Sequence, residues 1–189
     1  MIVANGSVKV KKENGICILS LNRPDVRNAL VTEMREELTV QLKQLQKDDE
    51  VKVIIITGEG PVFSAGGDLK ALKSVKTIEG RKRVKAGHEL ILTMLGMEKP
   101  IIAAVNGHAV GAGFSLALAC DIIIATDKSI FTQKFSRMGL IPDLGSTYFL
   151  SQLVGPYLAK RLMFLAEEIP AQKAQDLQAL GIYNVLDLL

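Results

Sequence analysis

The sequence predicts an α/β fold, and two observations support this prediction. Apolar runs of the length typical of buried strands recur at residues 51–57, 101–105 and 122–126. The segments between these runs are longer and place apolar side chains at helical spacing among charged ones. Alternation of the two patterns favours a parallel sheet covered by helices.

The first third of the chain is expected to form a hairpin, a helix and a strand. Residues 8–11 and 16–21 flank Asn14-Gly15, and Asn-Gly is a strong signal for a two-residue hairpin turn. An amphipathic helix is expected over residues 32–48. Its inner face would consist of Met34, Leu38, Leu42 and Leu45. The strand at 51–57 should then pair in parallel with the second hairpin strand after a right-handed crossover.

The middle of the chain is expected to be helical and is unusually basic. Residues 69–97 have helical periodicity, with Val84, Ile91 and Leu95 as the expected inward face. The basic side chains of this span are Lys70, Lys73, Lys76, Arg81, Lys82, Arg83 and Lys85. Between the first and the last of them the sequence has one acidic residue, Glu79. A solvated helix face is one explanation of this run, and contact with phosphate groups is the other.

Residues 100–121 combine a strand, a glycine-rich turn and a helix. The strand is expected at residues 101–105, and Asn106 and Gly107 end it. A helix is expected over residues 114–119. The second half of the chain should add a short strand at 130–132. Helices should follow at 146–153 and 156–166.

The turn before the helix at 114–119 has amide groups that side chains do not cover. Gly111 and Gly113 lack side chains, and a helix start favours negative charge. A dinucleotide site is not favoured, because Leu116 stands where the G-x-G-x-x-G motif needs its third glycine. The alternative is an oxyanion site, which needs a second donor. Residues 63–69 offer one in another turn of small residues after a buried strand.

Three motifs in order resemble the enoyl-CoA hydratase/isomerase family, or crotonases. They are NRPDVRNAL at 22–30, FSAGGDL at 63–69 and KPIIAAVNGHAVGAGFSLALACD at 99–121. The similarity continues through GLIPDLGSTYFLSQLVG at 139–155 to about residue 181. It implies a crotonase-like spiral of stacked β-sheets surrounded by helices. Residues 1–189 would form a single domain that lacks the family's usual C-terminal helical extension.

The resemblance also implies a site. The thioester carbonyl of an acyl-CoA would lie between the amides of Gly67 and Ala112, which match the family's two oxyanion donors. The other positions implied for the substrate are Arg27, Ala65, Gly66, Asp68, Leu69, Lys70, Gly111, Ser115 and Phe135. Coenzyme A would be part of the substrate, with its phosphates near the basic run, so no separate cofactor is expected.

The chain departs from the pattern of family members that hydrate double bonds. Such members typically carry glutamates at the positions of Ser115 and Phe135. Asp143 matches the lone acid of some isomerases of the family, and one carboxylate can take a proton from one carbon and return it to another. The alternative for Asp143 is a cap on the helix that begins near Ser146.

The resemblance therefore implies an enoyl-CoA isomerase that works through a stabilised enolate. An enoyl-CoA hydratase is the alternative within the enzymes of the family. A non-catalytic relative that binds acyl-CoA is the alternative outside them. Trimers or dimers of trimers are the assembly that the resemblance implies.

Length, composition and charge limit the number of domains, the partners and the location that can be expected. At 189 residues, 48% of them hydrophobic, the chain suits one domain with a substantial core. A formal net charge of +3, without aromatic residues interleaved among basic ones, does not favour nucleic acid as a partner. We expect a cytoplasmic protein without a membrane span, because no leader pattern opens the sequence and the longest apolar stretch is too short. No cluster has the spacing of metal ligands, so no metal is expected.

Overall fold

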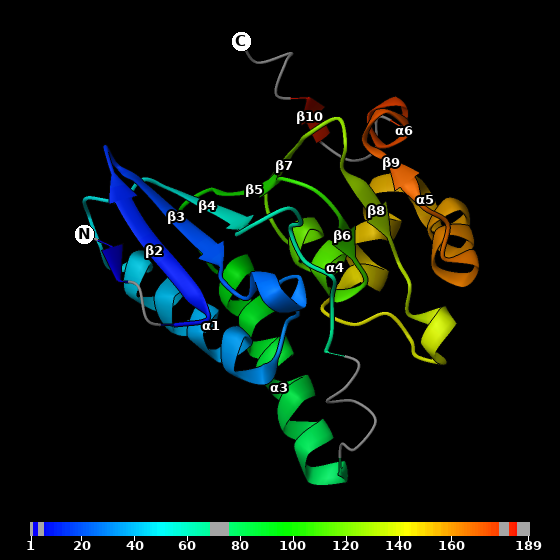
Figure 1. Cartoon of the computed structure of the whole chain (residues 1–189), viewed down its shortest axis with the longest axis horizontal. Helices are drawn as coiled ribbons and strands as arrows, with labels where there is room; N and C mark the ends of the chain where they lie inside the picture. Colours follow the sequence, from blue (N-terminus) through cyan, green and yellow to red (C-terminus); the bar gives the residue numbers. More distant parts are fainter. Residues whose placement is uncertain (1, 4–5, 69–75, 178–181, 185–189) are drawn as a thin grey trace.

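A seven-stranded sheet runs through the described part of the chain, which in this computed structural model comprises residues 2–3, 6–68, 76–177 and 182–184. In spatial order its strands are β1 (Ile2–Val3), β2 (Val8–Glu13), β3 (Ile16–Leu21), β4 (Val53–Gly58), β5 (Ile101–Val105), β7 (Ile122–Ala125) and β10 (Ile182–Asn184). The pairs β1–β2 and β2–β3 are antiparallel, and every pair from β3 to β10 is parallel. The predicted α/β class is therefore confirmed (Figure 1).

The predicted hairpin is present as β2 and β3. Val8 pairs with Leu21 at the open end and Glu13 with Ile16 at the turn. Asn14 has φ 49° and Gly15 has φ 80°, which is the backbone conformation that makes Asn-Gly a hairpin signal. The parallel pairing of β3 with β4 is also as predicted.

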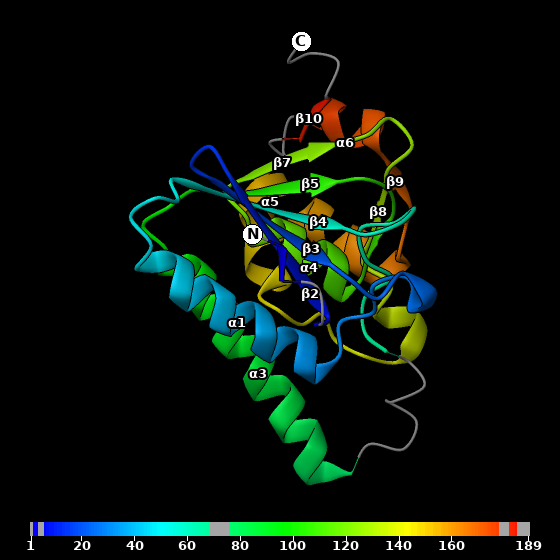
Figure 2. The same ribbon diagram turned by 60° about the vertical axis from the view of Figure 1, so that its left-hand side comes forward.

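Helices α1 (Thr32–Gln46) and α3 (Thr77–Leu95) pack together beside the large sheet (Figure 2). The predicted helix over residues 69–97 is confirmed from Thr77, while residues 69–75 lie outside the described residues. Its predicted inward face is wrong in part, because Val84 and Leu95 are exposed. The buried residues of α3 are Ala86, Gly87, Leu90, Ile91 and Met94. At Gly87 this face comes close to α1, because a Cβ on Gly87 would stand 2.9 Å from Nη1 of Arg35.

A second sheet of three strands lies beside the large one. Its order is β6 (Ala109–Val110), β8 (Ile130–Thr132) and β9 (Ile169–Pro170). Helix α4 (Ala112–Leu118) follows β6 directly, and all seven of its residues are buried. The strand at 130–132 and the helix after the glycine-rich turn were predicted from the sequence, whereas β6 and β9 were not.

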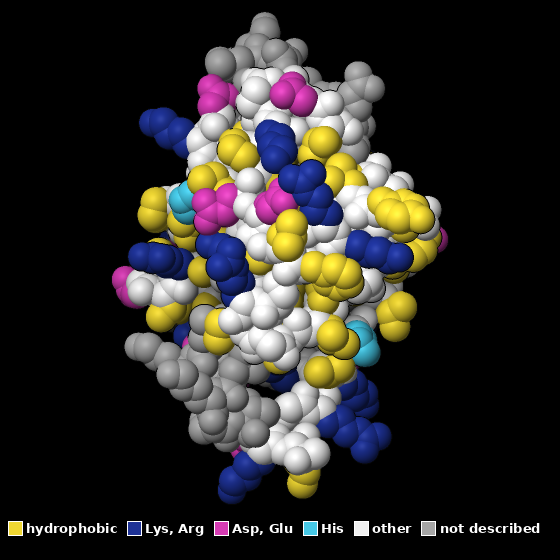
Figure 3. Space-filling view, turned by 90° about the vertical axis from the view of Figure 1, so that its right-hand side faces the viewer, with side chains coloured by type: hydrophobic (Ala, Val, Ile, Leu, Met, Phe, Trp, Pro, Cys, Tyr) yellow, Lys and Arg dark blue, Asp and Glu magenta, His cyan; other side chains and the backbone are white. Residues whose placement is uncertain are grey.

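Helix α5 (Ser146–Leu165) consists of two helical parts that meet at Gly155, whose φ of 76° and ψ of 159° are not helical. The two predicted helices, 146–153 and 156–166, correspond to these parts. Three further short helices of the described residues are η1 (Pro24–Val26), η2 (Ser136–Met138) and α6 (Ala171–Asp176), of which η1 and η2 are 3₁₀ helices. Large apolar side chains of α5 remain exposed, among them Tyr157 at 88% and Phe164 at 72%. On the face that Figure 3 shows, hydrophobic side chains stand in separate groups between basic and acidic ones.

The hydrophobic core joins the two sheets and their helices. It includes Leu19 and Ile54 of the large sheet, Leu38 of α1, Phe114 of α4 and Phe131 of β8. Phe114 and Phe131 have ring centroids 5.2 Å apart, a separation typical of favourable aromatic pairs. This packing holds α4 against β6 and α5 and thereby positions the turn that precedes it.

Candidate functional site

The two glycine-rich turns lie side by side. The amide of Ser64 donates to the carbonyl of His108 at 3.1 Å, and the amide of Val110 donates to the carbonyl of Ser64 at 2.9 Å. Together these bonds form a parallel bridge between Ser64 and Ala109. Residues far apart in the sequence are thus brought together just before Gly67 and Ala112.

Glycine at position 113 makes this close approach possible. A Cβ on Gly113 would stand 2.7 Å from both the Cβ and the carbonyl oxygen of Ser64, which is closer than real Cβ atoms come. Any larger residue at position 113 would therefore push the first turn away from α4.

A second segment, residues 27–30, holds the first turn from its other side. The amide of Ala65 donates to the carbonyl of Arg27 at 2.8 Å, and the amide of Leu30 donates to the carbonyl of Gly66 at 2.7 Å. Ser64 Oγ donates to the carbonyl of Asn28 at 2.8 Å and accepts from the amide of Gly66 at 3.1 Å. The backbone of the turn is therefore hydrogen-bonded on both sides.

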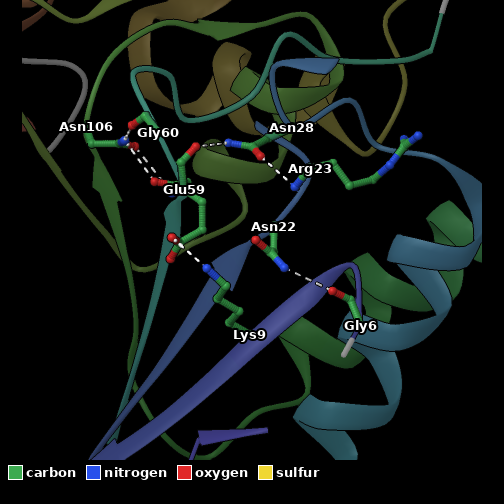
Figure 4. Close-up of polar contacts among 9 residues, drawn as sticks. Gly6, Lys9, Asn22, Arg23, Asn28, Glu59, Gly60 and Asn106 are labelled. Atoms are coloured by element: carbon green, nitrogen blue, oxygen red, sulfur yellow. Dashed lines mark hydrogen bonds and ion pairs between the residues drawn. The ribbon is translucent and has the colours of Figure 1, made fainter. Parts of the chain in front are cut away.

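Asn28 anchors that second segment to the loop after β4 (Figure 4). Its side chain is fully buried, and Nδ2 donates to the carbonyls of Glu59 and Val62, both at 2.9 Å. Oδ1 accepts from the amide of Arg23 at 2.9 Å. Asn106 ties the same loop to the end of β5, because its Nδ2 donates to the carbonyl of Gly60 at 2.8 Å. These bonds make the surroundings of the first turn rigid.

A cavity of about 160 Å³ lies where the two turns meet. Gly67 and Ala112 both line it, and the described hydrogen bonds include none that either amide donates. The other residues that line it are Ala65, Gly66, Arg83, Val110, Gly111, Lys134, Phe135, Arg137, Met138 and Leu140. The two residues that the sequence predicts as oxyanion donors thus border one mostly apolar space, and an oxyanion site requires two such donors near one point.

A larger cavity of about 560 Å³ adjoins the first, because Ala65, Val110 and Lys134 line both. Its polar side chains are Arg27, His108, Thr132, Lys134 and Glu168. Lys134 pairs with Glu168 at 2.9 Å. This bond lowers the pKa of the Glu168 carboxyl, and the charges of Lys134, His108 and Arg137 add to the effect.

Asp143 faces an arginine rather than the cavity itself. Its Oδ2 lies 3.5 Å from Nη2 of Arg83, a residue that lines the smaller cavity. Its Oδ1 is buried without a hydrogen-bond partner in the described part of the chain. The capping alternative is wrong for this side chain, because α5 has Gly145 at its N-cap and no side chain bonds to that end.

Arg35 of α1 is a second cation near Asp143. Its side chain is fully buried, and Nη1 donates to the carbonyl of Arg83 at 3.3 Å. Burial lowers the pKa of Arg35 to about 10, which the negative charge of Asp143 opposes and the positive charge of Arg83 assists. One carboxylate therefore lies near two guanidinium groups.

Of the remaining positions predicted for the substrate, some line the smaller cavity and others do not. Phe135 lines the smaller cavity, whereas Ser115 is buried outside its lining and donates from Oγ to the carbonyl of Gly111 at 3.1 Å. Asp68 is half-buried and lines neither cavity, while Leu69 and Lys70 lie outside the described residues.

Three cations that line the smaller cavity, Arg83, Lys134 and Arg137, were not predicted as site residues from the sequence. Arg83 was counted only as one member of a basic run, and that run was the available signal. Lys134 and Arg137 had no signal, because the short segment between β8 and α5 that holds them, η2 included, has no periodicity in the sequence. In the described ranges, no three or more His, Cys, Asp or Glu side chains gather in a way that would hold a metal ion. Nor is any described helix long and apolar enough for a membrane span.

Comparisons with known proteins agree with the motifs. The model of the enoyl-CoA hydratase/isomerase family matches residues 11–185. A short-chain-enoyl-CoA hydratase of Clostridium acetobutylicum is 39% identical over 179 residues, which are 94% of this chain and 67% of the relative. A 1,2-epoxyphenylacetyl-CoA isomerase of Escherichia coli is 37% identical over 168 residues, 87% of this chain and 64% of the relative.

Solved structures show the same relationship. An enoyl-CoA hydratase of Bacillus anthracis superposes with a TM-score of 0.90 at 31% identity, over 95% of this chain and 70% of that one. A putative enoyl-CoA hydratase of Thermobifida fusca, solved in complex with acetoacetyl-CoA, superposes with a TM-score of 0.86 at 32% identity. The match covers 95% of this chain and 74% of that one. The predicted crotonase fold is confirmed by these matches. The chain spans about two thirds of the length of the curated relatives it matches.

Proposed function

The chain belongs to the enoyl-CoA hydratase/isomerase family, and on that premise we propose that it binds an acyl-CoA thioester and moves the double bond of an enoyl-CoA through an enolate. The observation that carries the proposal is that Gly67 and Ala112, from two turns far apart in the sequence, line one cavity. The acetoacetyl-CoA complex of the Thermobifida fusca relative supports an acyl-CoA as ligand.

In the proposed reaction the two amides donate to the thioester oxygen. That oxygen gains charge when a proton leaves the neighbouring carbon, so donors already in place stabilise the enolate more than the substrate. Removal of one such donor typically costs about 2.7–4 kcal/mol of transition-state stabilisation. Hydrogen bonds to a charged oxygen are stronger in an environment of low dielectric constant than in bulk water, and most of the surface that lines the cavity is apolar.

Asp143 is the proposed base. Its carboxylate takes the proton from C2 of a 3-enoyl thioester. The electron pair of that C–H bond forms a C1–C2 double bond, and the π pair of the carbonyl moves to the thioester oxygen. When the carbonyl forms again, the C1–C2 pair becomes the C2–C3 double bond, and the pair of the former C3–C4 double bond takes the proton back from Asp143 at C4. Because Asp143 pairs with Arg83, its carboxylate has to turn from this arginine toward the acyl chain.

Hydration is the second candidate, and the names of similar proteins favour it. The relatives at 39% and 36% identity are named as hydratases. The residues at the two positions that carry glutamates in hydratases of the family argue against it, because Phe135 has no ionisable group and the hydroxyl of Ser115 is buried against Gly111.

Product analysis separates the candidates. The protein is incubated with a short 3-enoyl-CoA and, separately, with a 2-enoyl-CoA, and the thioesters are resolved by chromatography. The proposal expects 2-enoyl-CoA from the first substrate. Formation of 3-hydroxyacyl-CoA at an appreciable rate would support hydration instead. Binding without turnover of either substrate would indicate a non-catalytic acyl-CoA binder.

Assembly and location stay predictions. A trimer or a dimer of trimers is expected by resemblance to the family, and light scattering on the purified chain measures its mass directly. A cytoplasmic location is expected from the sequence alone.

A further inference from the structure

Positive charge surrounds the smaller cavity. The described residues that line it include the cations Arg83, Lys134 and Arg137 and no carboxylate. Two of the three pair with carboxylates that do not line it, Lys134 with Glu168 at 2.9 Å and Arg83 with Asp143 at 3.5 Å. An uncharged acyl group needs none of these cations.

Among the described cations that form ion pairs, Arg83 has the least exposed side chain. Its side chain is 19% exposed, against 44% for Lys134. A guanidinium carries five N–H donors in a planar fork that suits a carboxylate. The described ion pair of Arg83 joins one nitrogen to Asp143 at 3.5 Å, which is longer than the roughly 2.7–2.9 Å of a strong charge-assisted bond. Arg83 therefore has donors to offer a ligand in the cavity.

The charge balance behind Arg83 leads to the same conclusion. The single negative charge of Asp143 compensates two guanidinium groups, because it acts on the buried Arg35 as well as on Arg83. Nε and Nη2 of Arg35 are buried without a hydrogen-bond partner among the described residues. One unit of positive charge is thus left over beside the cavity, and a buried charge is costly unless it is paired.

We propose that the smaller cavity takes an acyl group whose far end carries a carboxylate, and that Arg83 pairs with this carboxylate. The inference rests on the proposed function, because it names the class of acyl-CoA that enters the same site. A volume of about 160 Å³ has room for about five groups of the size of a water molecule, so the acyl chain is short.

Two saturated ligands of equal chain length test the proposal without turnover. Glutaryl-CoA ends in a carboxylate, and pentanoyl-CoA ends in a methyl group. Calorimetric titration of the wild-type chain is expected to give at least about tenfold tighter binding of glutaryl-CoA, as one charge-assisted pair provides. In Arg83→Gln the ratio of the two affinities is expected to fall to about one.

Arg81→Gln is the matched control. Arg81 is exposed on the same helix and does not line the cavity, so this variant is expected to keep the ratio. The coenzyme A part is common to both ligands, so a contact with its phosphates would change both affinities equally. If Arg83→Gln weakened both ligands to the same extent, Arg83 would serve coenzyme A and the proposal would be overturned.

The wild-type comparison needs no variant, so the proposal can fail even if Arg83→Gln does not fold. Equal affinity of the wild-type chain for the two ligands would overturn it and leave the proposed function in place. Failure to bind either ligand would contradict the proposed function itself.

Discussion

Gly66 lies so close to Val110 that a Cβ on Gly66 would stand 2.5 Å from the Val110 carbonyl oxygen. The same Cβ would stand 3.3 Å from the amide nitrogen of Ala112. Gly66 also has φ +90°, a conformation that residues with side chains rarely adopt. Because Gly66 precedes Gly67, this contact determines where one proposed donor lies relative to the other.

Gly66→Ala is therefore expected to reduce isomerase activity by about 100-fold or more. The added methyl group forces the two turns apart, and a displacement of about 1 Å at a reacting centre typically has an effect of this size. The free energy of unfolding should also fall, by about 1–3 kcal/mol, because of the strained backbone. Steady-state assays and urea unfolding measure the two effects.

Gly155→Ala is the control for backbone strain. Gly155 has φ +76°, nothing lies within 4 Å of a Cβ built on it, and it lines neither cavity. This variant should lose stability but keep its activity. If Gly66→Ala were as active as Gly155→Ala, contact between the turns would have no role in catalysis.

Local sequence signals predicted most of the fold. The Asn14-Gly15 turn and the apolar runs specify the hairpin and the parallel strands, because each signal lies within the element that it predicts. The strands β6 and β9 have two residues each, which is too short for any periodicity. The inward face of α3 depends on its packing against Arg35 of α1, and a helical repeat does not contain that information.

The site was predictable only where a motif spans it. Gly67 and Ala112 belong to glycine-rich turns, and both line the smaller cavity. The pairing of Asp143 with Arg83 joins a loop to a helix far away in the sequence, so no local pattern reveals it. The position of Phe135 at the cavity followed from the resemblance, whereas that of Lys134 beside it followed from nothing in the sequence.

Asp143→Asn is expected to abolish isomerisation, because an amide cannot accept the proton from C2. It is also expected to lower the free energy of unfolding by about 1–3 kcal/mol, since Arg83 and the buried Arg35 would lose their carboxylate. Turnover of a 3-enoyl-CoA and urea unfolding are the measurements. Asp49→Asn, at an exposed position, should change neither quantity. Retained turnover in Asp143→Asn would remove Asp143 from the mechanism.

Asn28→Asp should be strongly destabilising although the two side chains have nearly the same shape. The substitution replaces Nδ2, which donates to the carbonyls of Glu59 and Val62, by an oxygen that repels both. Asn28 is fully buried, so we expect a loss of about 2–5 kcal/mol in the free energy of unfolding. The control is Asn22→Asp, where one bond to the carbonyl of Gly6 at 3.2 Å is lost and about 1 kcal/mol is expected. Equal losses in the two variants would contradict the anchoring role of Asn28.

The ion pair between Lys9 and Glu59 predicts a pH-dependent contribution to stability (Figure 4). The pKa of the Glu59 carboxyl lies below its usual value of 4.5, chiefly because Lys9 donates to it at 3.0 Å. The folded state therefore binds this proton less readily than the unfolded state, so the stabilisation is present above about pH 4.5 and is lost as the pH falls below it.

Lys9→Met should cost at most about 1 kcal/mol of the free energy of unfolding at pH 7, because both side chains are more than a third exposed. Urea unfolding of both proteins between pH 7 and pH 3 should show the difference closing at the acidic end, whereas Lys128→Met, at an exposed turn, should show no such trend. A difference that stayed constant over this range would mean that Lys9 acts through packing and not through the carboxylate of Glu59.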